Sequence, residues 1–242
     1  MEKNVICADI HSHIIFGIDD GAEDFETSAA MLEKEYSSGV RLLCLTPHYN
    51  PELFGEYDMR VAQERFEMIR EYAKKHFPDM DIRMGNEVCW HTDCIDALCK
   101  GKCKTLSGSR YVLVDFHGKE DAFEIIRALN TLISAGFFPV VAHVERYDGL
   151  FSSKNDLAEL SENGAVFQTN ASSVLSERKR LIKPVKKLIK EGIISIVSSD
   201  AHNMTDRPVL MKECGEYLAS AIGEELTKAV MFDNAEAVLD GR

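Results

Sequence analysis

The chain has 242 residues, of which 45% are hydrophobic and 28% charged, the composition of an ordinary soluble globular protein. Its formal net charge of −12 argues against general nucleic-acid binding, which requires a basic surface. The sequence has no apolar run long enough to cross a membrane, and its first residues do not resemble a signal peptide. We therefore expect a cytoplasmic protein with free thiols, folded as one domain over residues 1–242.

Apolar strand-like runs alternate with amphipathic helical stretches along the chain. Strands are predicted over residues 5–10, 41–46, 81–87, 111–116, 138–143, 165–170 and 194–198. Helices are predicted over residues 24–38, 57–76, 120–135, 153–163, 178–191, 209–222 and 224–232, with a helix-loop insertion at 91–110. This repeated strand–helix alternation is typical of a parallel α/β barrel.

The first predicted strand leads into Asp9-Ile10-His11-Ser12-His13. Side chains on a strand alternate between its two faces, so the two histidine rings point the same way. Two imidazoles beside a carboxylate suit a divalent transition metal. The turn at Asp19-Asp20-Gly21 supplies a further carboxylate close to this pair.

Most of the other predicted strands also end in residues of the kinds that bind metals. The carboxyl ends of parallel barrel strands form one face, so residues scattered in sequence should meet there. A mixed histidine and carboxylate set favours Mn, Fe or Zn over Mg or Ca. The set is too large for one ion, so two or three ions are expected, with a carboxylate such as Glu87 bridging them. The candidate ligands are His11, His13, His48, Glu87, Asp115, His143, Asp200 and His202, with one carboxylate of Asp19-Asp20 as a ninth.

A centre of several metal ions can hold a hydroxide nucleophile and clamp phosphoryl oxygens. It would also supply the positive charge that this acidic chain lacks. A thiolate mechanism is disfavoured, because the phosphate loop of cysteine-dependent tyrosine phosphatases needs Cys-x5-Arg and no cysteine here has an arginine at that spacing. The fingerprints of Walker and dinucleotide-binding loops are also absent from the sequence.

These residues closely resemble the PHP (polymerase and histidinol phosphatase) superfamily over essentially the whole chain. Within it, the chain is most similar to the CpsB type, the manganese-dependent tyrosine-protein phosphatases of bacterial capsule and exopolysaccharide gene clusters. The resemblance is carried by the segments DIHSH (9–13), DDG (19–21), TPH (46–48), GNE (85–87), SRYVLVDF (109–116), AHVERY (142–147) and SSDAHN (198–203).

The resemblance implies a distorted (β/α)7 barrel, TIM-like in architecture, with up to three ions, of which Mn2+ is expected and Fe or Zn are alternatives. It implies one ion bound by His11, His13, Glu87 and Asp200, a second bound by Glu87, Asp115 and His143, and a third bound by Asp20, His48 and His202. The subfamily often has Glu where this chain has Asp115, so this shorter ligand is expected to bind with a shifted geometry or through a water. Arg146 and Arg207 match arginines of the resembled phosphatases, and are expected to bind phosphate and stabilise transition-state charge.

The leading hypothesis is a protein-tyrosine phosphatase in which a metal-bound hydroxide attacks phosphorus in line. The resemblance implies that its substrate is the Tyr-rich tail of a bacterial tyrosine kinase of capsule or exopolysaccharide synthesis. Two alternatives stay open: a phosphatase of histidinol phosphate or another small phosphomonoester, and a non-catalytic metal-binding PHP module. Metal identity, oligomeric state and the role of His117 are left open, and Asp9 is expected to orient a histidine ligand.

Overall fold

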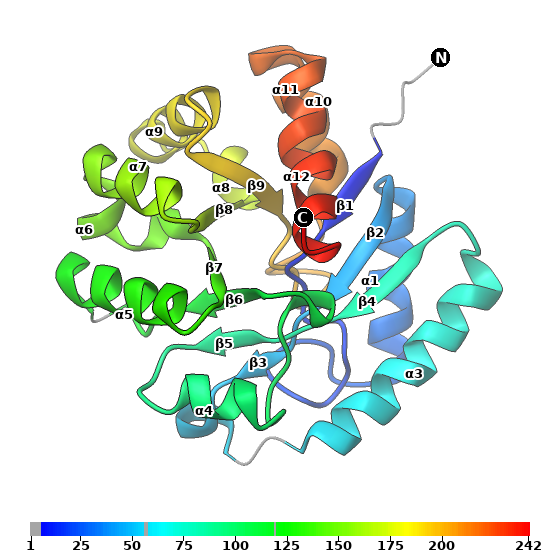
Figure 1. Cartoon of the computed structure of the whole chain (residues 1–242). Helices are drawn as coiled ribbons and strands as arrows, with labels where there is room; N and C mark the ends of the chain where they lie inside the picture. The colour runs from blue at the N-terminus through cyan, green and yellow to red at the C-terminus, as the bar shows by residue number, and fades with distance from the viewer. Residues whose placement is uncertain (1–5, 56–57, 119) are drawn as a thin grey trace.

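All the strands of the computed structural model, which describes residues 6–55, 58–118 and 120–242, pair in parallel (Figure 1). One sheet has the order β1-β2-β4 and the other β3-β5-β6-β7-β8-β9. The strands are β1 (Cys7–Asp9), β2 (Val40–Leu45), β3 (His48–Tyr49), β4 (Asp81–Met84), β5 (Glu87–Cys89), β6 (Tyr111–Asp115), β7 (Phe138–Val141), β8 (Val166–Asn170) and β9 (Ile194–Ser198).

Backbone contacts join the two sheets at both of their edges. Two residues separate β2 from β3 and β4 from β5, and across these breaks the Gly85 amide donates to the Leu45 carbonyl at 2.9 Å. At the other edge, the segments that follow β1 and β9 form a parallel bridge between Ser12 and Ala201. The predicted α/β fold, a distorted TIM-like barrel, is thereby confirmed, although the predicted strand 81–87 is divided into β4 and β5.

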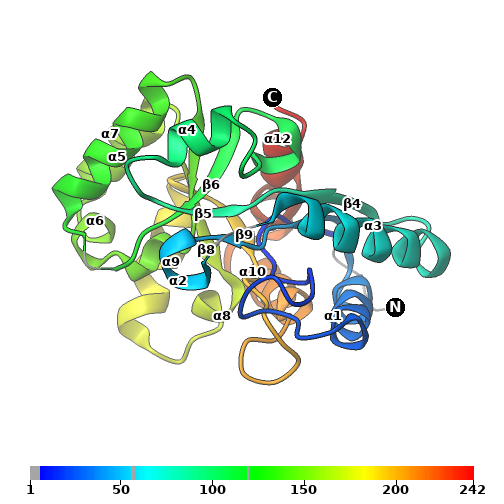
Figure 2. The same cartoon turned by 90° about the horizontal axis from the view of Figure 1, so that it is seen from below.

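Helices surround the strands, as Figures 1 and 2 show. Capping residues mark the first turn of α1 and α5. Asp24 accepts a hydrogen bond from the Thr27 amide, and Asp121 forms a capping box with Glu124. The α-helices are α1 (Phe25–Ser37), α2 (Pro51–Phe54), α3 (Met59–His76), α4 (Cys94–Cys99), α5 (Ala122–Ser134), α6 (Asp148–Phe151), α7 (Lys154–Glu162), α8 (Ala171–Val174), α9 (Lys179–Lys190), α10 (Met211–Ile222), α11 (Glu224–Lys228) and α12 (Asn234–Leu239). Two short 3-10 helices, η1 (Leu106–Gly108) and η2 (Val144–Arg146), and the π-helix η3 (Ala229–Asp233) complete them.

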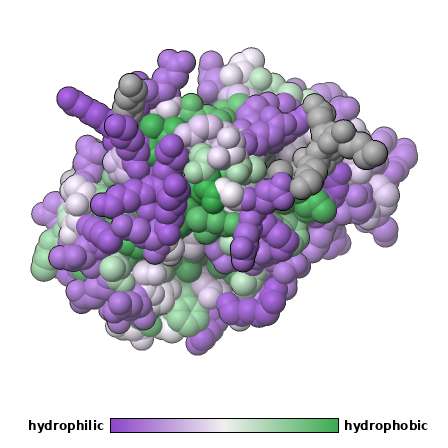
Figure 3. Space-filling view, turned by 90° about the horizontal axis from the view of Figure 1, so that it is seen from above, coloured by the Kyte–Doolittle hydropathy of each residue, from purple (hydrophilic) through white to green (hydrophobic). Residues whose placement is uncertain are grey.

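The predicted helices are found with small shifts at their ends. The last predicted helix, 224–232, continues through η3 and α12 to Leu239, and the 91–110 insertion holds α4 and η1. Two predicted starts, Val5 of the first strand and Tyr57 of the second helix, lie outside the described residues. None of the helices in the described ranges combines the length and apolar character that a membrane span needs. Hydrophilic residues cover most of the face seen in Figure 3.

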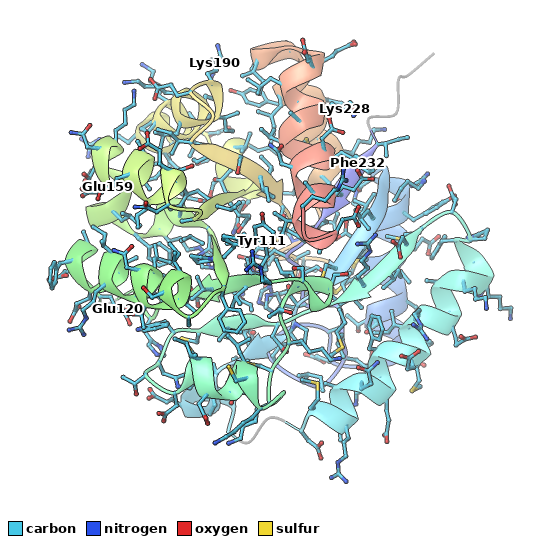
Figure 4. The ribbon with its side chains drawn as sticks, in the orientation of Figure 1. Tyr111, Glu120, Glu159, Lys190, Lys228 and Phe232 are labelled. Atoms are coloured by element: carbon cyan, nitrogen blue, oxygen red, sulfur yellow. The ribbon has the colours of Figure 1, made fainter. Side chains whose placement is uncertain are left out.

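Apolar side chains pack on both faces of the strands. Leu113 belongs to a cluster that includes residues of α12, whereas its neighbours Val112 and Val114 belong to a larger cluster with the surrounding helices. In Figure 1, α12 lies in front of the centre of the strands, and Figure 4 shows Tyr111 and Phe232 beside it. Burial on both faces holds the strands rigidly, so the residues at their carboxyl ends have well-defined positions.

Candidate metal centre

The predicted ligands lie at the carboxyl ends of strands, at the two breaks within strands and in the loops that follow. His11 and His13 follow β1, His143 follows β7, and Asp115 is the last residue of β6. His48 and Glu87 begin β3 and β5, just beyond the breaks in their strands, and pair with each other in the ladder. Asp200 and His202 follow β9, and Asp20 lies in the loop before α1.

Glu87 lies at the centre of this group and is fully buried. Its Oε2 atom is 3.2 Å from His11 Nε2, 3.2 Å from His13 Nε2 and 2.9 Å from His48 Nδ1. Its Oε1 atom is 3.0 Å from His143 Nε2. One carboxylate therefore contacts four imidazoles from three parts of the chain, which is the arrangement expected of a bridging ligand.

Eight of the nine predicted ligands fall into three overlapping groups whose ligand atoms lie within 4.8 Å of one another. These groups differ from the predicted sets in three respects. His13 also joins the group that contains Asp20, His11 takes the place of Asp115 beside Glu87 and His143, and Glu87 is absent from the group with Asp200. The groups are His11, Glu87 and His143; His11, His13 and Asp200; and His13, Asp20, His48 and His202.

Asp115 is the predicted ligand that stays outside these groups. Its Oδ1 atom is 3.7 Å from His143 Nε2 and accepts hydrogen bonds from the Tyr147 hydroxyl at 2.6 Å and the Phe116 amide at 2.7 Å. Burial, together with the charge of Glu87, raises the pKa of the Asp115 carboxyl. Tyr147 is not among the predicted site residues, although it lies only four residues after His143.

In the part of the chain that the structure describes, several buried ligand-type atoms lie close to one another but form no hydrogen bond of acceptable geometry. They are His11 Nε2, His13 Nε2, His202 Nε2 and Glu87 Oε2. An unsatisfied buried polar atom costs roughly 1–3 kcal/mol, so this concentration of such atoms fits a site built for cations. The backbone is also strained here: His143 and Asp200 have φ values of 32° and 54°, in the left-handed region that residues other than glycine rarely adopt.

Hydrogen bonds to Asp19 and Gln168 orient the histidines on the side away from Glu87. Asp19 Oδ2 lies 2.8 Å from His13 Nδ1 and accepts the His48 amide at 2.8 Å. Gln168 Oε1 lies 3.3 Å from His11 Nδ1 and accepts the His143 amide at 2.8 Å. Such partners fix the orientation of the rings that bind metals.

Asp9, expected to orient a histidine ligand, contacts the backbone amide of His11. Its carboxylate accepts the backbone amides of His11 and Ser199, both at 3.1 Å, and so fastens together the loops after β1 and β9. Asp19 contacts the ring of His13, and its loop packs closely on this histidine because residue 21 is glycine. A Cβ atom at Gly21 would lie 2.2 Å from the His13 carbonyl oxygen.

The carboxylates and imidazoles shift one another's pKa values. Burial alone would lower the pKa of His11, but the neighbouring Glu87 and Asp200 raise it to about 9. Burial favours the neutral form of Asp200, yet its contact with His11 holds the pKa of this carboxyl below its usual range. Despite its burial, the pKa of Glu87 is lowered as well, because His11 and His48 lie beside its carboxylate.

Arg146 and Arg207 reach the group from η2 and from the loop after β9. Arg146 Nη2 donates to Asp200 Oδ2 at 2.7 Å, and Arg207 Nη2 donates to Asp200 Oδ1 at 2.9 Å. Their side chains are 49% and 35% exposed, so both guanidinium groups lie between the buried carboxylate and solvent. An anion that enters from solvent would meet both of them.

The remaining candidates lie at the edge of this group or are chemically inert. His117 is about one third exposed and lies 3.3 Å from Cys89 Sγ, outside the three ligand groups. Burial raises the pKa of the Cys44 and Cys103 thiols to about 12 and also raises that of Cys89. These thiols are therefore protonated at neutral pH, which agrees with the expectation that catalysis does not use a thiolate.

Replacing Asp19 by asparagine is expected to weaken metal binding roughly 10- to 100-fold, because His13 loses its anionic partner. Competition with a fluorescent chelator measures this affinity. Asp24→Asn is a matched control, since the exposed Asp24 caps α1 and asparagine caps equally well. Equal affinities for the Asp19 variant and the control would contradict the assigned role.

Known proteins share both the sequence and the architecture. Residues 7–240 match the family described as "Capsular polysaccharide synthesis, CpsB/CapC". The chain is 32% identical over 237 residues to the tyrosine-protein phosphatase CpsB of Streptococcus pneumoniae, covering 96% of this chain and 97% of that protein. It superposes with a TM-score of 0.86 and 27% identity on a chain from the crystal structures of YwqE of Bacillus subtilis and CpsB of S. pneumoniae, which are described as metal-dependent tyrosine phosphatases. That match covers 97% and 95% of the two chains. Dihydropyrimidinase of Brevibacillus agri is similar in fold alone, with a TM-score of 0.55 at 11% identity over 97% of this chain and 70% of that one.

Proposed function

The chain belongs to the CpsB/CapC family of capsular polysaccharide synthesis, and from this premise we propose that it is a metal-dependent protein-tyrosine phosphatase. The observation that carries the proposal is the group of four imidazoles around Glu87. One of them, His11, also contacts Asp200, the carboxylate to which Arg146 and Arg207 donate. Such a group can hold cations, and the arginines can hold the phosphate of a substrate beside them.

We propose that the nine predicted ligands hold up to three ions, with manganese as the native metal and iron or zinc as alternatives that use the same ligands. Bound ions would lower the pKa of a water molecule and neutralise charge on phosphoryl oxygens. The proposed sets are His11, His13, Glu87 and Asp200; Glu87, Asp115 and His143; and Asp20, His48 and His202.

Arg146 and Arg207 are proposed to bind the phosphoryl oxygens that gain charge in the transition state. Both are already held by Asp200, Arg146 through Oδ2 and Arg207 through Oδ1, so their guanidinium groups are oriented before the substrate arrives. Asn170 donates to the same carboxylate at 2.7 Å and fixes its rotation. Preorganised donors of this kind need no rearrangement during the reaction.

The proposed substrate is phosphotyrosine on a protein, with the Tyr-rich tail of a bacterial tyrosine kinase as the proposed partner in the cytoplasm. The edge of the site supports a substrate of this size, because the Asp20 side chain is 51% exposed and both arginines are partly exposed. The phenolate of tyrosine leaves more readily than an alkoxide, which reduces the need for a strong general acid. Residues 1–242 are proposed to act as one domain.

The test compares kcat/KM for a phosphotyrosine peptide and for histidinol phosphate. Protein stripped with a chelator is expected to be inactive and to recover when manganese is added, and it is expected to prefer the peptide. Elemental analysis of protein purified without chelator should find more than one ion per chain. A preference for histidinol phosphate would support the small-substrate alternative, and no hydrolysis by fully loaded protein would support the non-catalytic one.

A further inference from the structure

A cavity of about 170 Å3 borders the candidate metal centre and shares His48 with it. Its walls combine the apolar side chains of Ile18, Phe54 and Val61 with polar residues, namely His48, Asn50, Asp58 and Arg65. None of the three apolar residues belongs to the ligand groups or contacts the two arginines by a hydrogen bond or ion pair within the described ranges. The proposed reaction therefore assigns no role to this cavity.

Phe54 forms the wall that lies against the metal-type residues. Its ring stacks on the His48 imidazole, with centroids 5.3 Å apart and planes inclined by 20°. The four-residue helix α2 places this ring, because the buried Asn50 caps the helix by accepting the Leu53 amide. Phe54 is only partly buried, so part of its surface faces the cavity.

The opposite wall is held by Arg65, which projects from α3. Its Nη1 atom donates to the carbonyl oxygens of Phe16 at 2.8 Å and Gly17 at 2.6 Å, and its guanidinium lies over the Phe16 ring. These bonds fasten the loop that carries Ile18 and leads directly to Asp19 and Asp20. Both walls are thus held in place by hydrogen bonds, which is a property of a preformed binding site.

We infer that this cavity binds the aromatic ring of phosphotyrosine, with Phe54 as the stacking surface, and so selects aryl over alkyl phosphomonoesters. The inference rests on the proposed phosphatase function. An apolar cavity of about 150 Å3 is large enough to bind benzene, so the cavity size suits one phenyl ring. In an aryl phosphate the ring is bonded to the ester oxygen and must lie next to the phosphate. The cavity meets this condition, because His48, one of the candidate metal ligands, is part of its lining. Aromatic pairs favour offset stacking.

Phe54→Ala is expected to lower kcat/KM for a phosphotyrosine peptide about tenfold, mainly through a higher KM, because the ring loses its stacking partner. The rate on a phosphoserine peptide of otherwise identical sequence should stay unchanged, since serine has no ring to place in the cavity. Phe54→Tyr should retain nearly full activity. Phe123→Ala is the matched control, because Phe123 is 71% exposed on α5 and should affect neither peptide.

The metal content of each variant is measured in parallel, because Phe54 could instead serve only to support His48. Equal losses on the two peptides, or a loss of bound metal that accounts for the loss of rate, would overturn the inference. An unchanged rate on phosphotyrosine would also overturn it. If the wild-type protein fails to hydrolyse the phosphotyrosine peptide, the proposed function fails first and the inference fails with it, so the two failures are distinguishable.

Discussion

Glu87→Gln is expected to reduce kcat/KM for a phosphotyrosine peptide about a thousandfold, which corresponds to about 4 kcal/mol of transition-state stabilisation. The reason is the position of this carboxylate, which contacts His11, His13, His48 and His143 and is fully buried. Glutamine keeps the size of the side chain but removes its charge, and it places an amide N–H₂ against imidazoles. A side chain that bridges several ligand groups cannot be replaced without disturbing all of them.

Metal content gives this prediction a second measurement. Elemental analysis should show fewer ions per chain in Glu87→Gln than in the wild type, while circular dichroism shows an unchanged fold. Glu159→Gln is the control, since Glu159 is an exposed residue on the outer side of α7 (Figure 4). A Glu87 variant with full metal content and more than a tenth of the wild-type rate would contradict the bridging role.

Arg146→Ala is expected to lower kcat about 100- to 1000-fold and to leave the metal content unchanged, because the arginine is proposed to contact phosphate rather than metal. Lysine at this position keeps the positive charge but loses the planar fork, so Arg146→Lys should recover only part of the rate. Steady-state kinetics on a phosphotyrosine peptide measure both effects. The exposed Arg127 on α5 offers a control, and Arg127→Ala should behave as the wild type.

Binding of inorganic phosphate separates this role from a structural one. The product should inhibit the wild type and Arg146→Lys more strongly than Arg146→Ala. Arg207 and Asn170 still hold the Asp200 carboxylate in the alanine variant, so the metal-type group should keep its shape. Unchanged inhibition by phosphate together with a loss of bound metal would show that Arg146 acts by positioning Asp200 instead.

The positions of the ligand-type residues could be predicted because parallel strands present their carboxyl ends on one face. His11 and His143 each follow a short apolar run, and the structure brings both to Glu87. Asp19 could not be chosen over Asp20 in this way, since neighbouring carboxylates in a turn have the same local pattern. The structure separates them: Asp19 is buried behind His13, while Asp20 is half exposed beside His48 and His202.

The contacts of Asp115 are a second feature that could not be predicted from the sequence. Its place at the end of β6 is a local property of the sequence, and it was predicted. Its engagement with the Tyr147 hydroxyl depends on how η2 turns after His143, where the backbone enters the left-handed region. A hydrogen bond between neighbouring strand ends leaves no periodic signal in the sequence, so it could not be foreseen.

The sequence by itself determined the α/β class of this protein and the chemical nature of its centre. Side-chain periodicity and strand-end composition are local properties, and they suffice for both. Only the tertiary structure decided which atoms meet: that Glu87 contacts four imidazoles, that Asp9 holds backbone amides, and that Phe54 stacks on His48 beside a cavity. These contacts join residues from distant elements, and their geometry depends on how the strands and helices pack rather than on any local pattern.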